Sequence, residues 1–226
     1  MYLKGVLMLP KLLRVLSAFA VAGTCCLPAV PAHGQTTAAK ALANFDGALS
    51  ATGELTTSVT GSSTGASSKN GSPQTESPSI SAGGLLSFRY THSNLVGFEA
   101  NYKFTRFNET FAQYLPGGSQ TNVHEFTFGY ILHGPTIFGA IPFGGVGAGS
   151  IYFKPTYKGG QAVPPQVRMA YYATVGLDDP IFTEHFGVRL QVRDLIYKAP
   201  DFLENYLFTG AHAQTIEPTI GVYYHF

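Results

Sequence analysis

The sequence predicts an all-β fold, an eight-stranded antiparallel up-and-down transmembrane β-barrel. Three observations predict it: a low charge content, apolar residues at every second position, and long connections that alternate with short ones. Only 12% of the 226 residues are charged, against about 25% in an average soluble domain. A mean hydropathy just above zero is too low for a bundle of membrane helices, whereas a barrel exposes apolar side chains only at alternate positions. The formal net charge of +1 gives no basic surplus, which argues against a nucleic-acid-binding protein.

Residues 1–34 have the features of a cleaved export signal. Basic side chains come first, at Lys4, Lys11 and Arg14. An apolar stretch follows over residues 15–27, about the length of the hydrophobic core of a signal. We expect cleavage before Gln35, with cleavage after Ala32 as the alternative. A membrane-anchoring helix is a second interpretation, but the stretch is shorter than the roughly 20 residues that a spanning helix needs.

Both cysteines, Cys25 and Cys26, lie inside this predicted signal. Lipidation at Cys25 is an alternative, although residues 22–24 match poorly the small-residue box that precedes a lipidated cysteine. If the signal is removed, the mature chain contains no cysteine. Disulfides and thiolate metal sites are then excluded.

Apolar residues alternate with small or polar ones along most of the chain that follows the signal. Phe98, Ala100 and Tyr102, for example, alternate with Glu99 and Asn101, and this period of two is typical of β-strands. Eight stretches of about ten residues show it, a length that suits a tilted strand crossing a membrane. The predicted strands cover about residues 45–59, 80–90, 96–105, 124–132, 141–153, 167–177, 186–193 and 215–226.

The fifth of these stretches is unusual because glycines at 145, 147 and 149 interrupt its apolar residues. We assign Ile141, Phe143, Ile151 and Phe153 to its outer, apolar face. The glycines would leave room for water or for a neighbouring tyrosine, or would relieve crowding at a bend.

Charged residues fall almost entirely on the polar side of the alternation. An arginine or lysine that faces lipid at mid-membrane costs about 2–4 kcal/mol, so a membrane barrel would sort its charges in this way. Arg106 and Asp194 are exceptions, and both lie near a strand end. A soluble sandwich would turn the same charges toward water. In the barrel they form a network in the lumen: Glu54, Arg89, Glu99, Lys103, Glu125, Lys154, Arg168, Arg189, Arg193 and Glu217.

Connection lengths favour the barrel over the sandwich. Long segments at about 60–79, 108–121, 155–165 and 199–211 follow the first, third, fifth and seventh predicted strands. Short connections lie near 92–94, 134–135 and 178–180. An up-and-down barrel places the long loops on the outer side of a membrane and the short turns on the inner side, whereas Greek-key connections give no such rhythm. We therefore expect one barrel domain over residues 35–226.

The last predicted strand ends in alternating apolar residues, Ile220, Val222, Tyr224 and Phe226. A terminal aromatic after such a series resembles the assembly signal of bacterial outer-membrane barrels. Together with the strand pattern, the loop rhythm and the glycine-rich stretch 143–149, it makes residues 42–226 similar to the OmpA-like family of small eight-stranded barrels. The resemblance implies a bacterial outer-membrane location, contact with outer-membrane lipid, and recognition of the C-terminal strand by the barrel-assembly machinery. The chain departs from the family in lacking Trp, so Tyr and Phe would form the interfacial girdles.

An eight-stranded barrel has an interior that side chains nearly fill. Four glutamates and six basic residues are assigned to it, and burial requires such charges to be paired or hydrated. A salt-bridged plug is the first interpretation, and the second is a narrow path that conducts when pairs exchange partners. The predicted role is therefore structural or in surface interaction, with a small porin-like ion or solute channel as the alternative.

Enzymatic activity is not expected from the sequence. An outer-membrane lipid hydrolase needs a His and a Ser close together on the lipid-facing side. His92 and Ser93 are adjacent and would point to opposite faces, and His124 has Phe126 rather than Ser two residues away. We predict no catalytic, cofactor-binding or metal-binding residues; a lipid-modifying enzyme remains the least favoured alternative. The long loops carry exposed aromatic residues that could bind an extracellular ligand.

Overall fold

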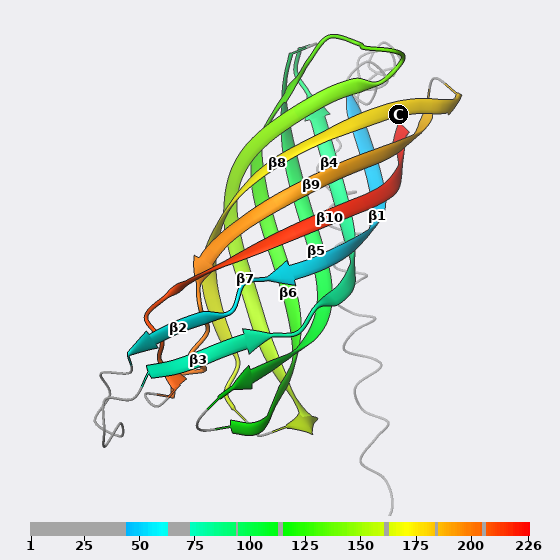
Figure 1. Cartoon of the computed structure of the whole chain (residues 1–226). Helices are drawn as coiled ribbons and strands as arrows, with labels where there is room; N and C mark the ends of the chain where they lie inside the picture. The colour runs from blue at the N-terminus through cyan, green and yellow to red at the C-terminus, as the bar shows by residue number, and fades with distance from the viewer. Residues whose placement is uncertain are drawn as a thin grey trace, which may run out of the picture. The chain divides into compact units, whose positions relative to one another are not determined.

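A computed structural model describes residues 44–62, 73–93, 95–112, 115–160, 163–183, 185–204 and 207–226. Their strands form one antiparallel sheet in the order β2-β3-β5-β4-β1-β10-β9-β8-β7-β6, and β6 also pairs with β5, which closes the sheet (Figure 1). The predicted eight-stranded antiparallel barrel is confirmed. The predicted signal at residues 1–34 lies outside the described residues. In the part of the chain that is described, we find no helix of the length and apolarity needed to cross a membrane.

Eight strands form the wall of the barrel, and two short strands extend it on one side. The wall consists of β1 (Phe45–Thr56), β4 (Ser81–Thr91), β5 (Val96–Phe111), β6 (Leu115–His133), β7 (Ile141–Gly160), β8 (Gln166–Thr183), β9 (Phe186–Lys198) and β10 (His212–His225). The extension is a hairpin of β2 (Val59–Ser62) and β3 (Pro73–Pro78).

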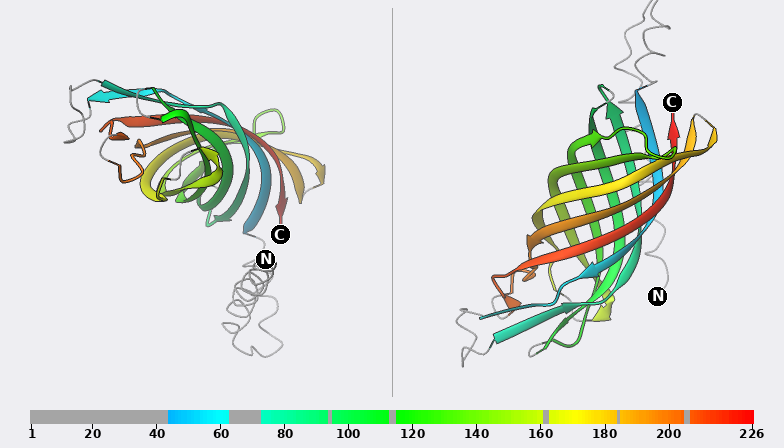
Figure 2. Two further views of the ribbon diagram at one scale, coloured as in Figure 1. Left: turned by 90° about the horizontal axis from the view of Figure 1, so that it is seen from below. Right: turned by 45° about the horizontal axis from the view of Figure 1, so that its top comes forward.

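The two ends of the barrel differ, as Figure 2 shows. We call the end with the β4–β5 and β8–β9 turns the turn end; the last residue, Phe226, lies there and its amide donates to the carbonyl of Phe45. We call the opposite end, with the β2–β3 hairpin and segment 199–211, the loop end. Short connections therefore gather at one end and the strand extensions at the other.

Several strands continue into segments that the sequence predicts as loops. The β2–β3 hairpin occupies part of 60–79, and β3 pairs with β5 from Glu76 opposite Phe111 to Pro78 opposite Glu109. β6 and β7 are 19 and 20 residues long, which leaves little of the predicted loops 108–121 and 155–165. The serine, glycine and threonine residues that suggested loops are compatible with strands here because neighbouring strands satisfy their backbone groups.

The turn predicted at 178–180 lies farther along the chain. β8 continues to Thr183, and its register with β9 shifts between Asp179 and Thr183. Pro180 lies inside this irregularity, where a missing amide proton does not break a regular ladder. Asp178 therefore belongs to the wall, and its side chain is buried in the interior.

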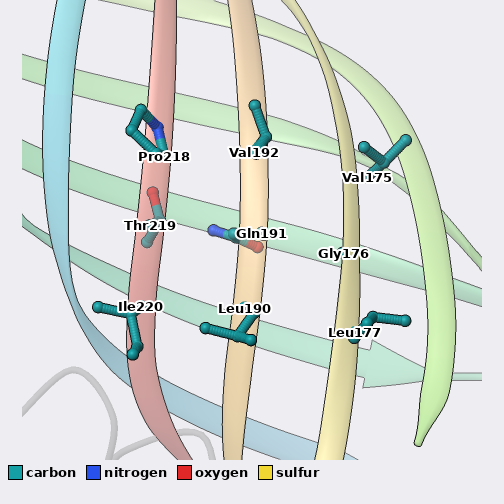
Figure 3. A pocket seen from close by; sticks show the side chains of 9 residues that line it. All are labelled: Val175, Gly176, Leu177, Leu190, Gln191, Val192, Pro218, Thr219 and Ile220. Atoms are coloured by element: carbon teal, nitrogen blue, oxygen red, sulfur yellow. The ribbon is translucent and has the colours of Figure 1, made fainter.

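The outer surface of the wall is a band of apolar side chains. Figure 3 shows part of it from outside, where the side chains of β8, β9 and β10 form two apolar rows across the strands. One row contains Val175, Val192 and Pro218, and the other contains Leu177, Leu190 and Ile220. The row between them, Gly176, Gln191 and Thr219, belongs to the opposite face of the sheet. The alternation thus places apolar groups outside, as a hydrocarbon environment requires.

The outward assignment of four residues in the fifth predicted strand is wrong. Phe143, Ile151 and Phe153 of β7 are buried in the interior, and Ile141 lines a pocket at the turn end. Val146, of the opposite parity, is 62% exposed on the outer face. The glycines explain the error, because residues without side chains do not show which face of a strand is apolar.

Tryptophan scanning would test this orientation, since the chain has no Trp of its own. Val146→Trp should be quenched strongly by lipids brominated on their acyl chains, because position 146 faces outward. Phe143→Trp, three residues away and inside, should be quenched much less. Stronger quenching at 143 would show that β7 has the opposite face outward.

Candidate functional site: the charged interior of the barrel

A cluster of five charged side chains crosses the interior toward the turn end. Arg89 pairs with Glu99 at 2.7 Å and with Asp178 at 3.2 Å. Arg189 pairs with Asp178 at 2.7 Å and with Asp46 at 3.1 Å. All five side chains are buried, so each arginine connects two acids across the lumen. We call this set the Arg89–Arg189 cluster.

Aromatic rings cover the guanidinium groups of this cluster. The ring centre of Phe143 lies 4.0 Å from the Arg89 guanidinium and 5.6 Å from that of Arg189. Tyr223 lies 5.2 Å from Arg189. A cation over an aromatic face is attracted by it, most strongly where water is excluded. The inward position of Phe143 therefore has an electrostatic as well as a packing role.

A second cluster of charged side chains lies beside the first one, on the side of the loop end. Arg193 pairs with Glu125 at 2.5 Å and with Glu217 at 2.9 Å. Lys103 pairs with Glu125 at 3.0 Å, with Glu54 at 3.6 Å, and closely with Glu217. The side chains of these residues are at most 4% exposed, so the pairs are shielded from water. We call this set the Lys103–Arg193 cluster.

Tyr172 joins the two clusters. Its hydroxyl donates to Glu99 at 3.1 Å, and its ring lies 4.9 Å from the Arg193 guanidinium. Gly129 and Gly147 provide the space: a Cβ would lie 2.3 Å from the Tyr172 hydroxyl at Gly129 and 2.5 Å from its ring at Gly147. Gly147 of β7, with Gly129 of β6, therefore accommodates the tyrosine of β8, one of the roles that the sequence suggested.

Beyond the second cluster the interior becomes apolar. Phe202 and Leu207, from segment 199–211, are fully buried there, and the Phe202 ring meets Phe111 edge to face at 6.1 Å. The sequence suggested that aromatic residues of this segment were exposed; Phe208 is partly exposed, but Phe202 is buried. The buried members of this apolar plug are Val59, Phe107, Phe111, Val123, Ile151, Phe153, Ala170, Tyr172, Leu195, Tyr197, Ala199, Phe202, Leu207 and Ala213.

A group of polar side chains is buried beside the plug, at the loop end. Glu76 of β3 and Glu109 of β5 are close enough for their carboxyl groups to share a hydrogen bond. Both lie beyond the apolar band, and burial raises the pKa of Glu76 to about 8 and that of Glu109 well above its usual value. Nearby, Arg168 pairs with Asp201 at 2.8 Å. The loop end thus holds a second type of polar site, in which two carboxyl groups contact each other.

The structure separates the ten predicted lumen residues into three groups. Arg168 faces the interior at the loop end, apart from both clusters. Lys154 is exposed on the outer face of β7, so its assignment to the lumen is wrong for the reason given for Phe153. The other eight belong to the two clusters: Glu54, Arg89, Glu99, Lys103, Glu125, Arg189, Arg193 and Glu217.

Lys154 belongs to a polar row at the outer edge of the apolar band. It lies opposite Asn122 of β6, which lies opposite Arg106 of β5. Arg106 donates from Nε to Asn122 at 2.6 Å. On the other side of the barrel, Asp194 accepts two hydrogen bonds from Gln214 at 2.9 Å. Both charged exceptions to the alternation therefore have polar partners on the outer surface.

Sequence analysis missed four buried acids. Asp46 lies inside the first predicted strand, on the same side as Glu54, but was not included in the lumen network. Glu109 shares the parity of Lys103 in β5, so a longer third predicted strand would have included it. Asp178 was missed because the sequence predicted a turn at 178–180. Glu76 was missed because it lies in the segment 60–79, which was predicted to be a loop. With Asp201 they change the interior from six basic and four acidic residues to five basic and nine acidic ones among those described.

The ring hydrogen bonds of the described histidines are with partners other than serine hydroxyls. His124 is on the outer face and its Nδ1 lies 2.9 Å from the Tyr102 hydroxyl. His92 follows β4 in an exposed turn. Within the described ranges, no three or more His, Cys, Asp or Glu side chains gather as a candidate metal cluster.

A pocket of about 580 Å³ opens from the lumen at the turn end. Asp46 and Asp178 of the Arg89–Arg189 cluster line it, together with His133, Tyr223 and His225. The lumen is therefore accessible from the turn end as far as the first cluster.

Comparison with solved structures shows the same barrel in outer-membrane proteins. Neisserial surface protein A, from Neisseria, matches with a TM-score of 0.55 and 14% identity over 81% of this chain and 97% of that one. The outer membrane protein OprG of Pseudomonas aeruginosa matches with a TM-score of 0.56 and 14% identity over 81% and 96%. No family model and no curated protein matches the chain. Its fold is that of the small eight-stranded outer-membrane β-barrels.

Proposed function

We propose that the chain is an integral protein of the bacterial outer membrane, without enzymatic activity, whose barrel is closed to solutes. Its role is structural or in surface interaction. The observation that carries this proposal is the series of buried side chains along the lumen. Two ion-pair clusters and an apolar plug lie in series along it.

The burial of the clusters supports a closed lumen. In a water-filled pore, solvent would hydrate charged side chains, whereas Arg193, Glu125 and Glu217 have no exposed surface. Buried charges are tolerated only where partners replace water, and here each guanidinium has two acids. Phe202 and Leu207 close the loop end above them.

The outer surface supports the membrane location. Outer-membrane lipid would cover the apolar band, and Tyr and Phe residues such as Phe98, Tyr130 and Tyr171 would form its aromatic contacts. Ile220, Val222, Tyr224 and Phe226 are all partly exposed at the outer face of β10 and its end. Under this proposal, the barrel-assembly machinery recognises these residues.

Conductance across a planar bilayer tests the closed lumen. The wild-type barrel should give no step-like currents in concentrated KCl. The variant Lys103→Ala/Arg193→Ala should give cation-selective steps, because it widens the lumen and leaves Glu54, Glu125 and Glu217 lining it. Regular steps from the wild-type protein would contradict the proposal.

A cation-selective channel is the second candidate, and the excess of acidic over basic residues in the interior favours it. An acidic lumen attracts cations and repels anions. Under this alternative, the wild-type barrel itself conducts, and its reversal potential in a KCl gradient lies on the cation side. The bilayer experiment therefore separates the two candidates.

Labelling of single cysteines tests the orientation in the membrane. Thr110→Cys, exposed at the loop end, should react with a membrane-impermeant maleimide in whole cells. Ser93→Cys, in the exposed turn after β4, should react only after the outer membrane is opened. The unsubstituted protein controls for Cys25 and Cys26, and labelling of Ser93→Cys in intact cells would reverse the assigned orientation.

A further inference from the structure

Two carboxyl groups meet in the loop end without a basic residue between them. Glu76 and Glu109 are each 1% exposed, and their carboxyl groups lie within hydrogen-bonding distance of each other. The Oε2 atom of each has no hydrogen-bond partner among the described residues. Two buried carboxylates in contact repel one another, so a proton or a cation has to balance them.

Neutral polar groups lie on the same face of the neighbouring strands. Ser119 of β6 is directly opposite Glu109 in the register, which places their Cβ atoms about 5 Å apart. Gln74 precedes Glu76 by two residues in β3 and so shares its face. Both are fully buried, and in the described structure the Ser119 hydroxyl and both amide atoms of Gln74 have no partner. Buried polar groups are almost always partnered, so these point to a bound group.

The charged residues nearby indicate the sign and magnitude of the charge on that bound group. Arg168 and Asp201 are the charged residues outside the pair that act on Glu76, and Arg168 is already bound to Asp201 at 2.8 Å. Glu54, which acts on Glu109, is paired with Lys103 at 3.6 Å. The carboxylates of Glu76, Glu109 and Asp201 therefore share the guanidinium of Arg168. The group that balances them when all are ionised carries two positive charges.

We propose that Glu76 and Glu109, together with Gln74 and Ser119, bind a divalent cation of the calcium or magnesium class. All the donors are oxygens, which such hard cations prefer, and calcium tolerates an irregular set of ligands better than magnesium does. The ion would link β3 to β5 and β6. In the described residues the ladder between β3 and β5 has three residue pairs, so the ion would strengthen the attachment of the β2–β3 hairpin to the barrel wall.

The test uses the full mature chain, folded in zwitterionic detergent and freed of divalent ions with a chelator. Calcium chloride is then titrated calorimetrically, with magnesium chloride for comparison. We expect one calcium site per chain and an affinity that falls about tenfold or more in Glu76→Gln and in Glu109→Gln. Asp179→Asn, which removes an exposed carboxylate at the turn end, should bind calcium as the wild type does.

Trypsin provides a second measurement, because Lys69 lies between β2 and β3 in the sequence. Saturating calcium should slow cleavage after Lys69 about tenfold or more in the wild type and in Asp179→Asn. It should have no effect in the two glutamine variants. Heat-modifiable gel mobility establishes that each variant is folded, and Gln74→Leu/Ser119→Ala replaces any glutamine variant that is not.

Three results would overturn the proposal. The first is the absence of calcium binding by the wild type. The second is binding that is unchanged in both glutamine variants, which would place the ion elsewhere. The third is equal trypsin cleavage of wild type and glutamine variants with and without calcium, which would indicate that a shared proton balances the carboxyl pair.

Discussion

Replacing Arg193 with methionine should lower the free energy of unfolding by about 3–5 kcal/mol. The guanidinium contacts Glu125 and Glu217, and all three side chains are fully buried. Methionine fills much of the same volume but leaves both carboxylates to Lys103 alone. Uncompensated buried charge accounts for most of the cost. Urea unfolding in phosphatidylcholine vesicles, followed by the fraction of heat-modifiable barrel on a gel, measures it.

Arg168→Met is the matched control for this prediction. Arg168 also pairs with an acid, Asp201, but the two side chains are 18% and 16% exposed. A partly solvated pair contributes about 0–1 kcal/mol, so the control should unfold close to the wild type. Equal losses for Arg193→Met and Arg168→Met would mean that water reaches the Lys103–Arg193 cluster, and the closed lumen would then be untenable.

Replacing Leu190 with arginine should cost about 2–4 kcal/mol, because position 190 faces lipid near the middle of the apolar band. Its neighbours across the strands are Leu177 and Ile220, both apolar and outward. The same urea experiment measures the loss. It requires lipid vesicles rather than detergent, since a detergent micelle adapts more easily to a new charge.

Ile196→Arg provides a matched control on the same strand. Ile196 and Leu190 are both 47% exposed on the outer face, but Asp194 lies between them and marks the outer edge of the band. Arginine at 196 should therefore cost about 0–1 kcal/mol. If the two variants lose the same stability, the outer surface of β9 has no depth dependence and does not cross a bilayer.

The sequence was sufficient to predict the barrel because the alternation of apolar and polar residues recurs in most of its strands. Leu190, Val192 and their counterparts are large, so each strand shows its apolar face. The prediction was wrong in β7, where Gly145, Gly147 and Gly149 remove that information, and the inner face is evident only from contacts with neighbouring strands, such as that of Gly147 with the Tyr172 ring. The cost of exposing a charge to lipid correctly predicted that most charged residues face the lumen. It does not apply at the edge of the apolar band, where Lys154 faces outward.

The presence of charged side chains in the lumen was predictable from the sequence. Their pairing and the excess of acidic over basic residues were not. Parity identified eight members of the two clusters, because charges inside a barrel must alternate with apolar residues outside. Their pairing depends on register between strands far apart in sequence, such as Lys103 with Glu217, which a single sequence does not contain. Glu76 was missed because its segment has loop composition, and its burial depends on the contact of β3 with β5.

The strand extensions at the loop end determine how far this protein projects from the hydrocarbon region of the membrane. Seven residues of β6 precede Asn122, the residue at the edge of the apolar band. At about 3.4 Å per residue and a tilt of about 40°, they lift the β5–β6 turn roughly 18 Å above the hydrocarbon. The β2–β3 hairpin stands on the same side (Figure 1). In the orientation proposed above, a large particle such as an antibody or a phage tail would therefore touch this β-sheet ridge before it touches the lipid, and would meet it away from the barrel axis.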